Sequence, residues 1–240
     1  MPQLDPATKL DSGALRVCLR ARLSLPFPCQ DDAALAAGNT THCNKRVPSG
    51  ALCGVAIQGA ADRHAWWCGK GGAVVRGHHN VRDWLGAWLL QRTGSAAALR
   101  DVTEQRVTQW DRTVRGQLEQ AVLDVVFPDK AGQQTYVDVT YHTPGAGSAA
   151  QLARHAAEPT AGLADVVGGK LRRYPPSQHP TAGFVPFAVG ALGRLSPEAR
   201  GLLASMAVDG QDARRAYQAA SALTQRRLAD VLRASEPRRP

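Results

Sequence analysis

Two apolar stretches, AVLDVVF (residues 121–127) and TYVDVTY (residues 135–141), decide the expected fold of this chain. Both are rich in the β-branched and aromatic residues that favour strands, and the PDKAGQQ between them is typical of a hairpin loop. Pro128 cannot donate to a sheet ladder, so it marks the end of the first strand. Asp124 interrupts the first stretch and Asp138 the second. Each strand is therefore expected to present one carboxylate from a largely buried region.

The sequence on either side of this hairpin predicts further helices and strands. A helix is expected over residues 81–92, where apolar residues recur at spacings of three and four, and another over 163–174, before a Pro-Pro pair. The remaining expected elements are strands at 102–110 and 183–189, a loop or loosely held helix at 144–160, a helix beginning at Ser196–Pro197, and a final helix at 211–233. This order predicts an α/β domain with a mixed sheet flanked by helices.

Four segments are expected along the chain. They are a leader (1–40), a small module of loops that carries Cys and His (41–80), the α/β domain (81–195), and C-terminal helices with a basic tail (196–240). No internal repeat is found, and 240 residues are enough for one domain with a small accessory module.

The composition is that of a globular, basic protein. Hydrophobic residues make up 44% and charged residues 20%, close to the averages of folded domains. Lys and Arg outnumber Asp and Glu by 29 to 20, which favours a polyanionic partner such as nucleic acid over an acidic small molecule. No apolar run of 18 or more residues and no signal-peptide pattern is present, so we expect an intracellular protein without a membrane partner.

The two aspartates suggest a site for a divalent cation. Two carboxylates about 4 Å apart repel by ~4 kcal/mol at an effective dielectric of 20, and burial adds to that cost. Mg²⁺ (or Mn²⁺) would compensate, because it prefers oxygen ligands and keeps positions for water and substrate phosphate. Glu104 could add a third ligand, and Lys170 could stabilise the extra negative charge of a phosphoryl transition state.

The same residues have simpler interpretations. A single Asp in a strand is more often a hydrogen-bonded or strand-end residue, and Lys170 alone is usually a solvated helix residue. Tyr174, one turn after Lys170, is a further candidate catalytic residue, although a tyrosine at this spacing is usually part of the core. Only the combination of the two aspartates with a lysine at helical spacing favours catalysis.

The cysteines favour metal binding over disulfides, because there are five of them and all lie in the first third of the chain. The last three join a histidine in the pattern C-x9-C-x10-H-x3-C, formed by Cys43, Cys53, His64 and Cys68. Such ligands suit a structural Zn²⁺, whose binding contributes roughly 10 to 16 kcal/mol and could fold a loop-rich segment. The pattern lacks CxxC pairs, so small buried residues are the alternative. Residues that could replace a ligand are Cys29, His42, His78 and His79.

Basic residues surround this module, with Trp66 and Trp67 among them. That composition suits contacts with phosphates and stacking on bases, although it is equally compatible with a solvated face and tryptophans that pack on the helix at 81–92. The candidate nucleic-acid-binding residues are Lys45, Arg46, Lys70, Arg76, His79 and Arg82.

Taken in order, the motifs resemble a known family. They are THC, LCG, RHAWWC, GGAVVRGHHNVRDWL, LDVVF, YVDVT, GGKLRRY and FVPFAV, between about residues 41 and 200. The chain resembles the restriction-like endonuclease region, a branch of the PD-(D/E)XK nucleases, that follows reverse transcriptase in some non-LTR retrotransposons and has an adjacent CCHC zinc knuckle. The resemblance implies a restriction-endonuclease-like fold.

The resemblance also assigns roles to individual residues. Asp124 and Asp138 would hold the metal, Glu104 would be the helical acid that often assists, and Lys170 would be a displaced active-site lysine. Leu123 and Thr140 depart from the motif, which has proline and lysine at these two places. Activity would therefore depend on Lys170 reaching the site from its helix.

The expected function is that of a Mg²⁺-dependent endodeoxyribonuclease that nicks target DNA for retrotransposition. Its expected partners are DNA, with RNA as a second candidate, and an attached or associated reverse transcriptase, which implies a nuclear location. One alternative is a catalytically inactive zinc-containing nucleic-acid-binding module or retrotransposon remnant. Another is a structural or partner-binding domain dominated by the C-terminal helices.

Overall fold

The computed structural model of the chain describes residues 72–143, 149–158, 160–178 and 183–233 continuously. Of the preceding segment it describes 10–11, 14–15, 18, 41–43, 51–57, 64 and 68. Among the described helices, none combines the length and the apolar character needed to cross a membrane.

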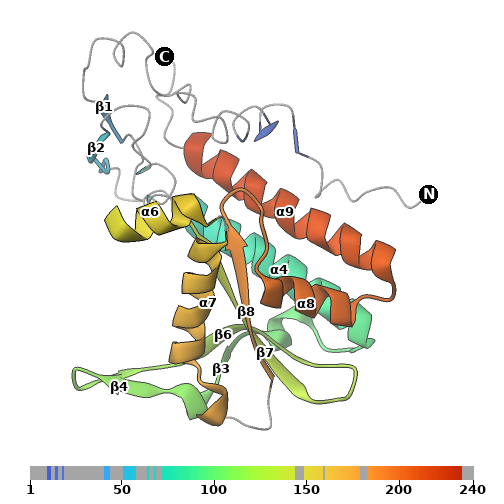
Figure 1. The fold of residues 1–240 in the computed structure, drawn as a ribbon. Coiled ribbons are helices and arrows are strands. Elements are labelled where there is room, and N and C mark those ends of the chain that lie inside the picture. The colour runs from blue at the N-terminus through green and yellow to red at the C-terminus, as the bar shows by residue number, and fades with distance from the viewer. Residues whose placement is uncertain are drawn as a thin grey trace.

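A four-stranded mixed sheet lies at the centre of the structure (Figure 1). Its strands, in spatial order, are β3 (Thr103–Arg106), β6 (Val122–Pro128), β7 (Gln134–His142) and β8 (Gly183–Gly190). The first three pair antiparallel, whereas β7 and β8 pair parallel from Thr135↔Gly183 to His142↔Gly190. A parallel pair needs a long crossover connection, and the segment between β7 and β8 supplies helices for it.

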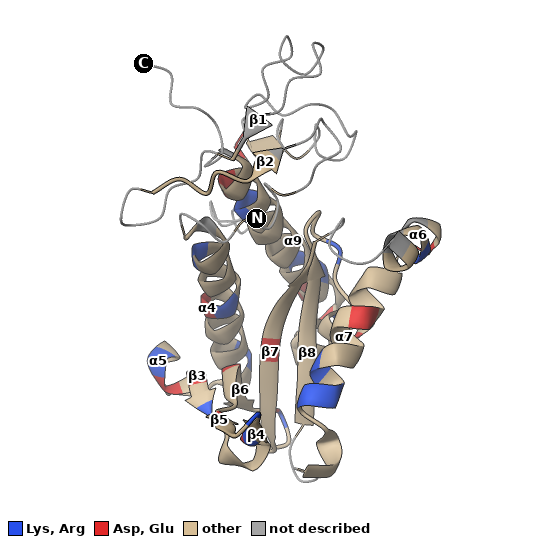
Figure 2. Ribbon diagram, turned by 90° about the vertical axis from the view of Figure 1, so that its left-hand side faces the viewer, with Lys and Arg blue, Asp and Glu red and all other residues tan. Residues whose placement is uncertain are grey.

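Helices cover both faces of the sheet (Figure 2). One face packs on α4 (Ala73–Thr93), α8 (Pro197–Met206) and α9 (Gly210–Arg233), with Val125, Val137 and Phe187 in the shared core. The other face packs on α7 (Ala161–Arg173), which follows α6 (Ala149–Ala157). The prediction of an α/β domain with a mixed sheet flanked by helices is confirmed.

Several elements differ from the expected ranges. Helix α4 begins at Ala73 rather than at residue 81, and Gly77 in its first turns packs against the side chain of Arg227. Ser196 caps α8 by accepting a hydrogen bond from the Ala199 N–H at 3.2 Å. The shorter elements are β1 (Thr41–His42), β2 (Ala56–Ile57), α5 (Leu99–Val102), and the 3-10 helices at Thr108–Trp110 and Pro176–Gln178.

The segment that connects β3 to β6 along the chain contains a β-hairpin that the sequence did not predict. This hairpin projects from the sheet (Figure 1). It consists of β4 (Arg112–Val114) and β5 (Gln117–Glu119), which form a two-stranded sheet of their own in the described part of the chain. All of its residues are exposed.

Candidate functional site

The two central strands stop pairing where their aspartates lie. The antiparallel register of β6 and β7 ends at Val125↔Val137, one residue pair before Asp124 and Asp138. On the next strand, Glu104 has a left-handed backbone, with φ 53, between two residues that pair with β6. Non-glycine residues in this conformation carry strain and cluster at functional sites. Pairing between β6 and β7 therefore ends, and the backbone of β3 is irregular, at the level of these three acids, whereas β7 and β8 stay paired past Asp138.

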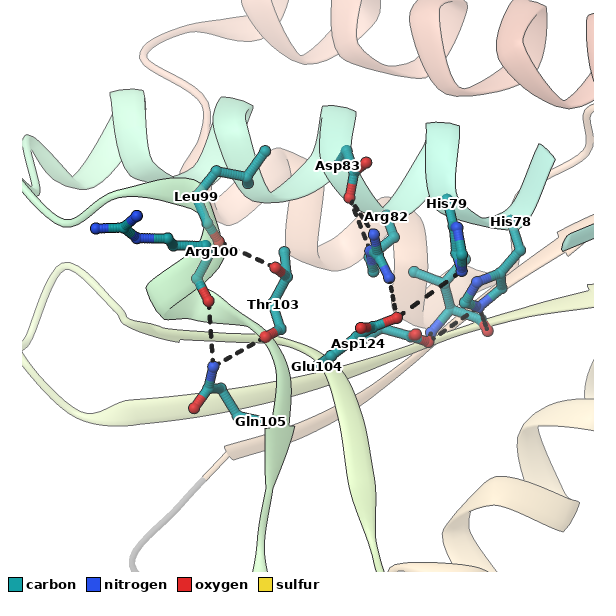
Figure 3. A network of polar contacts seen from close by, with 11 residues as sticks. His78, His79, Arg82, Asp83, Leu99, Arg100, Thr103, Glu104, Gln105 and Asp124 are labelled. Atoms are coloured by element: carbon teal, nitrogen blue, oxygen red, sulfur yellow. Dashed lines mark hydrogen bonds and ion pairs between the residues drawn. The ribbon is translucent and has the colours of Figure 1, made fainter. Parts of the chain in front are cut away.

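Side chains satisfy the backbone groups of Val139 next to this interruption. The Val139 N–H donates to Asp124 Oδ2 at 2.6 Å, and His78 Nε2 lies 3.2 Å from both the Val139 carbonyl oxygen and Asp124 Oδ2. Both partners of Nε2 are acceptors, so Nε2 carries a hydrogen. Asp124 and His78 thus hold β6, β7 and α4 together at the site (Figure 3).

Asp138 is buried, with 8% of its side chain exposed, and faces Lys170 on α7. The Lys170 Nζ lies 2.6 Å from Asp138 Oδ2 and forms an ion pair with it between α7 and β7. Burial raises the pKa of Asp138 to about 6, and the Lys170 charge offsets this effect only in part. An ionised carboxylate oxygen accepts more than one partner, so Oδ2 can contact a further electropositive group besides Lys170.

Asp124 differs from Asp138 in its protonation behaviour. Burial would raise the pKa of Asp124, but its other interactions, led by the hydrogen bond and the charge of His78, hold the pKa below its ordinary value. In turn, the hydrogen bond to Asp124 raises the pKa of His78 despite the opposing effect of burial. The ionised Asp124 also contributes to the raised pKa of Asp138, so the two carboxylates interact directly. Such a pair favours a cation between them.

Glu104 lies on β3, not on a helix, and is connected to α4 (Figure 3). Its carboxylate forms an ion pair with Arg82 and lies 3.8 Å from His79 Nε2. Arg82 also pairs with Asp83 at 2.7 Å, which leaves its guanidinium largely committed within the protein. Adjacent histidines of one helix therefore contact two of the candidate acids, His78 contacting Asp124 and His79 contacting Glu104.

Tyr174, a further predicted catalytic residue, is part of the core. The Tyr174 ring packs in an apolar cluster, 5.6 Å from the Trp110 ring centroid and 5.1 Å from that of Phe184. Arg76 is exposed on the first turns of α4. Lys45, Arg46 and Lys70, like Trp66 and Trp67, lie outside the described residues.

Sequence reasoning considered His78 as a substitute zinc ligand, and missed its contact with Asp124. The only available signal was its spacing of four residues from Arg82, which places both side chains on one face of a helix. The 46 residues that separate His78 from Asp124 gave no reason to join them.

A second cluster lies in the segment before α4. The ligand atoms of Cys43, Cys53, His64 and Cys68 all lie within 4.8 Å of one another. Cys68 Sγ is 3.8 Å from Cys43 Sγ and 3.6 Å from Cys53 Sγ, far beyond the roughly 2.05 Å of a disulfide. Cys53 Sγ is 3.4 Å from His64 Nε2. These four side chains could hold a metal ion such as zinc, as the sequence pattern predicted.

Local backbone structure brings these ligands together. Strands β1 and β2 pair antiparallel, and beyond them the Cys43 N–H donates to the Val55 carbonyl at 2.9 Å while the Gly54 N–H donates to Cys43 at 3.1 Å. The Cys68 N–H donates to the His64 carbonyl at 3.0 Å, which places these two side chains one helical turn apart. Of the substitute ligands considered, His78 and His79 contact the carboxylates instead, whereas Cys29 lies outside the described residues.

Comparison with known protein families, with curated proteins and with solved structures gives no match to this chain. The chemistry of the carboxylate site therefore rests on its own geometry. The site combines two interacting carboxylates, of which Asp138 is buried, with the adjacent ammonium of Lys170.

Proposed function

We propose that the chain is a divalent-metal-dependent endonuclease of the restriction-like, PD-(D/E)XK type. The observation that carries the proposal is the convergence of Asp124, Asp138 and Lys170 at the point where β6 and β7 separate. The order of helix, three antiparallel strands, helix and parallel strand supports a restriction-endonuclease-like fold, which the sequence motifs resemble.

Asp124 and Asp138 would hold the Mg²⁺ ion. Glu104, whose carboxylate contacts Arg82 and His79 of α4, could contribute an outer ligand. The buried Asp138 carboxylate fits this assignment, because its oxygens have lone pairs left for a metal ion beside the Lys170 ammonium that Oδ2 already contacts. When bound, such an ion polarises a phosphoryl oxygen and lowers the pKa of a coordinated water. The Val139 N–H and His78 fix the direction of the Asp124 carboxylate, so this ligand is oriented before any metal arrives.

Lys170 is the residue on which catalysis depends. Thr140 stands where a strand lysine is usual in these nucleases, and the Lys170 ammonium reaches Asp138 from α7 instead. It is 31% exposed, so it can contact both the buried carboxylate and a phosphate that approaches from solvent. An ammonium in this position would stabilise the negative charge that develops on the phosphate during hydrolysis.

The proposed substrate is DNA, nicked at a target site in support of an associated reverse transcriptase. Supercoiled plasmid should be converted to the open-circular form in Mg²⁺, and Asp124→Ala or Asp138→Ala should reduce the rate by about 10³-fold, a loss of roughly 4 kcal/mol. Lys170→Met should lose activity in the same way, whereas Lys170→Arg should retain part of it. Glu158→Gln, at an exposed acid after α6, is the matched control. Full activity in both aspartate variants would exclude the assignment.

The second candidate is a zinc-containing nucleic-acid-binding module without chemistry. It is favoured by the Cys/His cluster, which would give such a module its own structural metal. This reading predicts DNA affinity that falls steeply with salt, by a slope near ~0.9 per phosphate contacted, and no cleavage with Mg²⁺ or Mn²⁺. The plasmid assay and a salt titration of binding distinguish the two functions.

A further inference from the structure

The hairpin β4–β5 is exposed on both faces. Residues 112–120 are all exposed, including Val114 at 41% and Leu118 at 60%. An isolated two-stranded hairpin is marginally stable in water, so an arm of this kind normally gains order from a partner or a rigid base. Figure 1 shows it extending away from the sheet and its helices.

The base of the hairpin is fixed to the elements that carry the candidate site. Arg173 of α7 donates to the Trp110 carbonyl at 2.6 Å and lies 3.4 Å from the Glu119 carboxylate. Arg173 is one turn from Lys170, and Glu119 lies only a few residues before the strand that presents Asp124. The arm therefore has a defined position relative to the carboxylates.

The tip of the hairpin combines a strained backbone with an unpaired charge. Arg115 and Gly116 have φ 50 and φ 79 and form the two-residue loop between the paired Val114 and Gln117, as in a type I′ turn. That turn favours Asn-Gly, and arginine adopts its left-handed conformation only rarely. Arg112 pairs with Glu119 at 2.8 Å, whereas Arg115 has no acidic partner in the described part of the chain. Turn geometry therefore does not explain an arginine at this position, whereas binding to a polyanion would.

We propose that the β4–β5 hairpin is an arm that enters a groove of duplex DNA beside the carboxylate site, with Arg115 in contact with phosphate. The inference rests on the proposed function for its substrate. Three residues per strand extend about 10 Å. The major groove of B-DNA is about 12 Å wide and 8.5 Å deep and admits a two-stranded ribbon. The exposed Arg115 supplies the charge complementary to the backbone.

Arg115→Asn separates the charge of the tip from the stability of the turn. Asparagine suits the left-handed conformation, so the melting temperature should stay the same or rise. Affinity for a fluorescein-labelled 24-base-pair duplex, measured by anisotropy of the full chain without divalent metal, should fall roughly eightfold at 0.1 M salt. The slope of log affinity against log salt should fall by about 0.9, and Arg115→Lys should restore most of the affinity.

Arg214→Gln is the matched control, because it removes one exposed positive charge from α9, far from the arm (Figure 1). Its affinity should stay within twofold of the unchanged chain. Equal losses of DNA affinity in Arg115→Asn and Arg214→Gln, or no loss in Arg115→Asn, would overturn the proposal that the hairpin binds DNA. So would a concentration-dependent dimer in sedimentation that Leu118→Ser abolishes, because the hairpin would then bind a second copy.

Plasmid nicking separates this inference from the proposed function. If the unchanged chain nicks DNA and Arg115→Asn binds equally well, the nuclease stands and the arm is wrong. If no chain nicks DNA but Arg115→Asn binds more weakly with a reduced salt slope, the arm stands and the nuclease is wrong. Failure of the unchanged chain to bind duplex DNA would overturn both.

Discussion

The carboxylate site and the Cys/His cluster are related to the fold in opposite ways. Asp124 and Asp138 lie on strands whose other side chains form the main core, so packing of the sheet brings them together at an electrostatic cost. The cysteines and His64 belong to a segment in which Cys43, Cys53 and Cys68 are themselves the packed group. Folding of the sheet forms the carboxylate site, and the buried charges of that site lower the free energy of unfolding. In the Cys/His segment, by contrast, metal binding is expected to drive folding.

The largest effect that follows from this comparison is expected at Cys68. Cys68→Ser should remove the bound zinc, because the cluster loses one of four ligands and structural zinc contributes roughly 10 to 16 kcal/mol. Zinc per chain, measured by atomic emission, should fall to background, and proteolysis before residue 72 should increase. The sheet should keep its cooperative unfolding. Cys18→Ser is the control, because Cys18 is buried against α9 and should leave the zinc in place. Full zinc content in Cys68→Ser would contradict a metal site.

The converse substitution lies in the core of the sheet. Phe187 is fully buried between the sheet and its helices, and Phe187→Ala should destabilise the sheet by about 3 to 5 kcal/mol in a denaturant titration. Zinc content under native conditions should not change. Val208→Ala, at a side chain 79% exposed, should shift stability by less than about 0.5 kcal/mol. If Phe187→Ala also released the zinc, the two regions would not be energetically independent.

Burial of the Asp138 carboxylate should make the free energy of unfolding depend on pH. Its folded pKa is raised to about 6, so the proton is bound more tightly in the folded than in the unfolded state. The stability that this provides is fully present below about pH 3.8 and is lost as the pH rises through 6. Asp138→Asn should therefore stabilise the metal-free sheet. The difference in free energy of unfolding between this variant and the unchanged chain should grow by about 2 kcal/mol between pH 4.5 and 7.5.

Urea titrations at several pH values measure this advantage. Glu158→Gln provides the baseline for loss of an exposed carboxylate. An advantage that is constant with pH would mean that Asp138 is not held at an elevated pKa, and the site would then lack the electrostatic cost that distinguishes it from the cluster.

The sequence was most informative where local pattern and tertiary structure agree. Strands β6 and β7 lie within one residue of the predicted ranges, because β-branched residues and a turn signal define them locally. The hairpin β4–β5 was missed because RTVRGQLE is polar throughout and its Arg-Gly turn lacks the usual asparagine. The early start of α4 was missed because Gly77 is a poor helix former, and its use there depends on close packing with Arg227.

The candidate site was predictable in its acids but not in its supporting contacts. Asp124 and Asp138 stand out because each is a charge in an apolar strand. The separation of β6 and β7, the left-handed Glu104 and the contact of His78 with Val139 depend on packing between elements distant in sequence. No period of three, four or two residues encodes them.

The smallest of these effects is expected at His78, which supports the carboxylate site. His78→Gln should destabilise the sheet by about 1 kcal/mol, because the charged hydrogen bond from His78 to the ionised Asp124 is lost. The loss is small because glutamine can still donate a neutral hydrogen bond. The pKa of His78 is raised in the folded protein, so its charged form contributes stability below about pH 6.5, which is lost as the pH rises through the folded value. The destabilisation should thus be larger at pH 6 than at pH 9.

Denaturant titrations without added divalent metal test this, with His79→Gln as the control. His79 is the adjacent residue on α4, is 44% exposed and lies 3.8 Å from Glu104, so its loss should have a smaller effect at both pH values. If His78→Gln destabilised the sheet equally at pH 6 and pH 9, the imidazole would act through packing alone. Asp124 would then be oriented chiefly by the Val139 N–H, and α4 would make no charged contact with the site through His78.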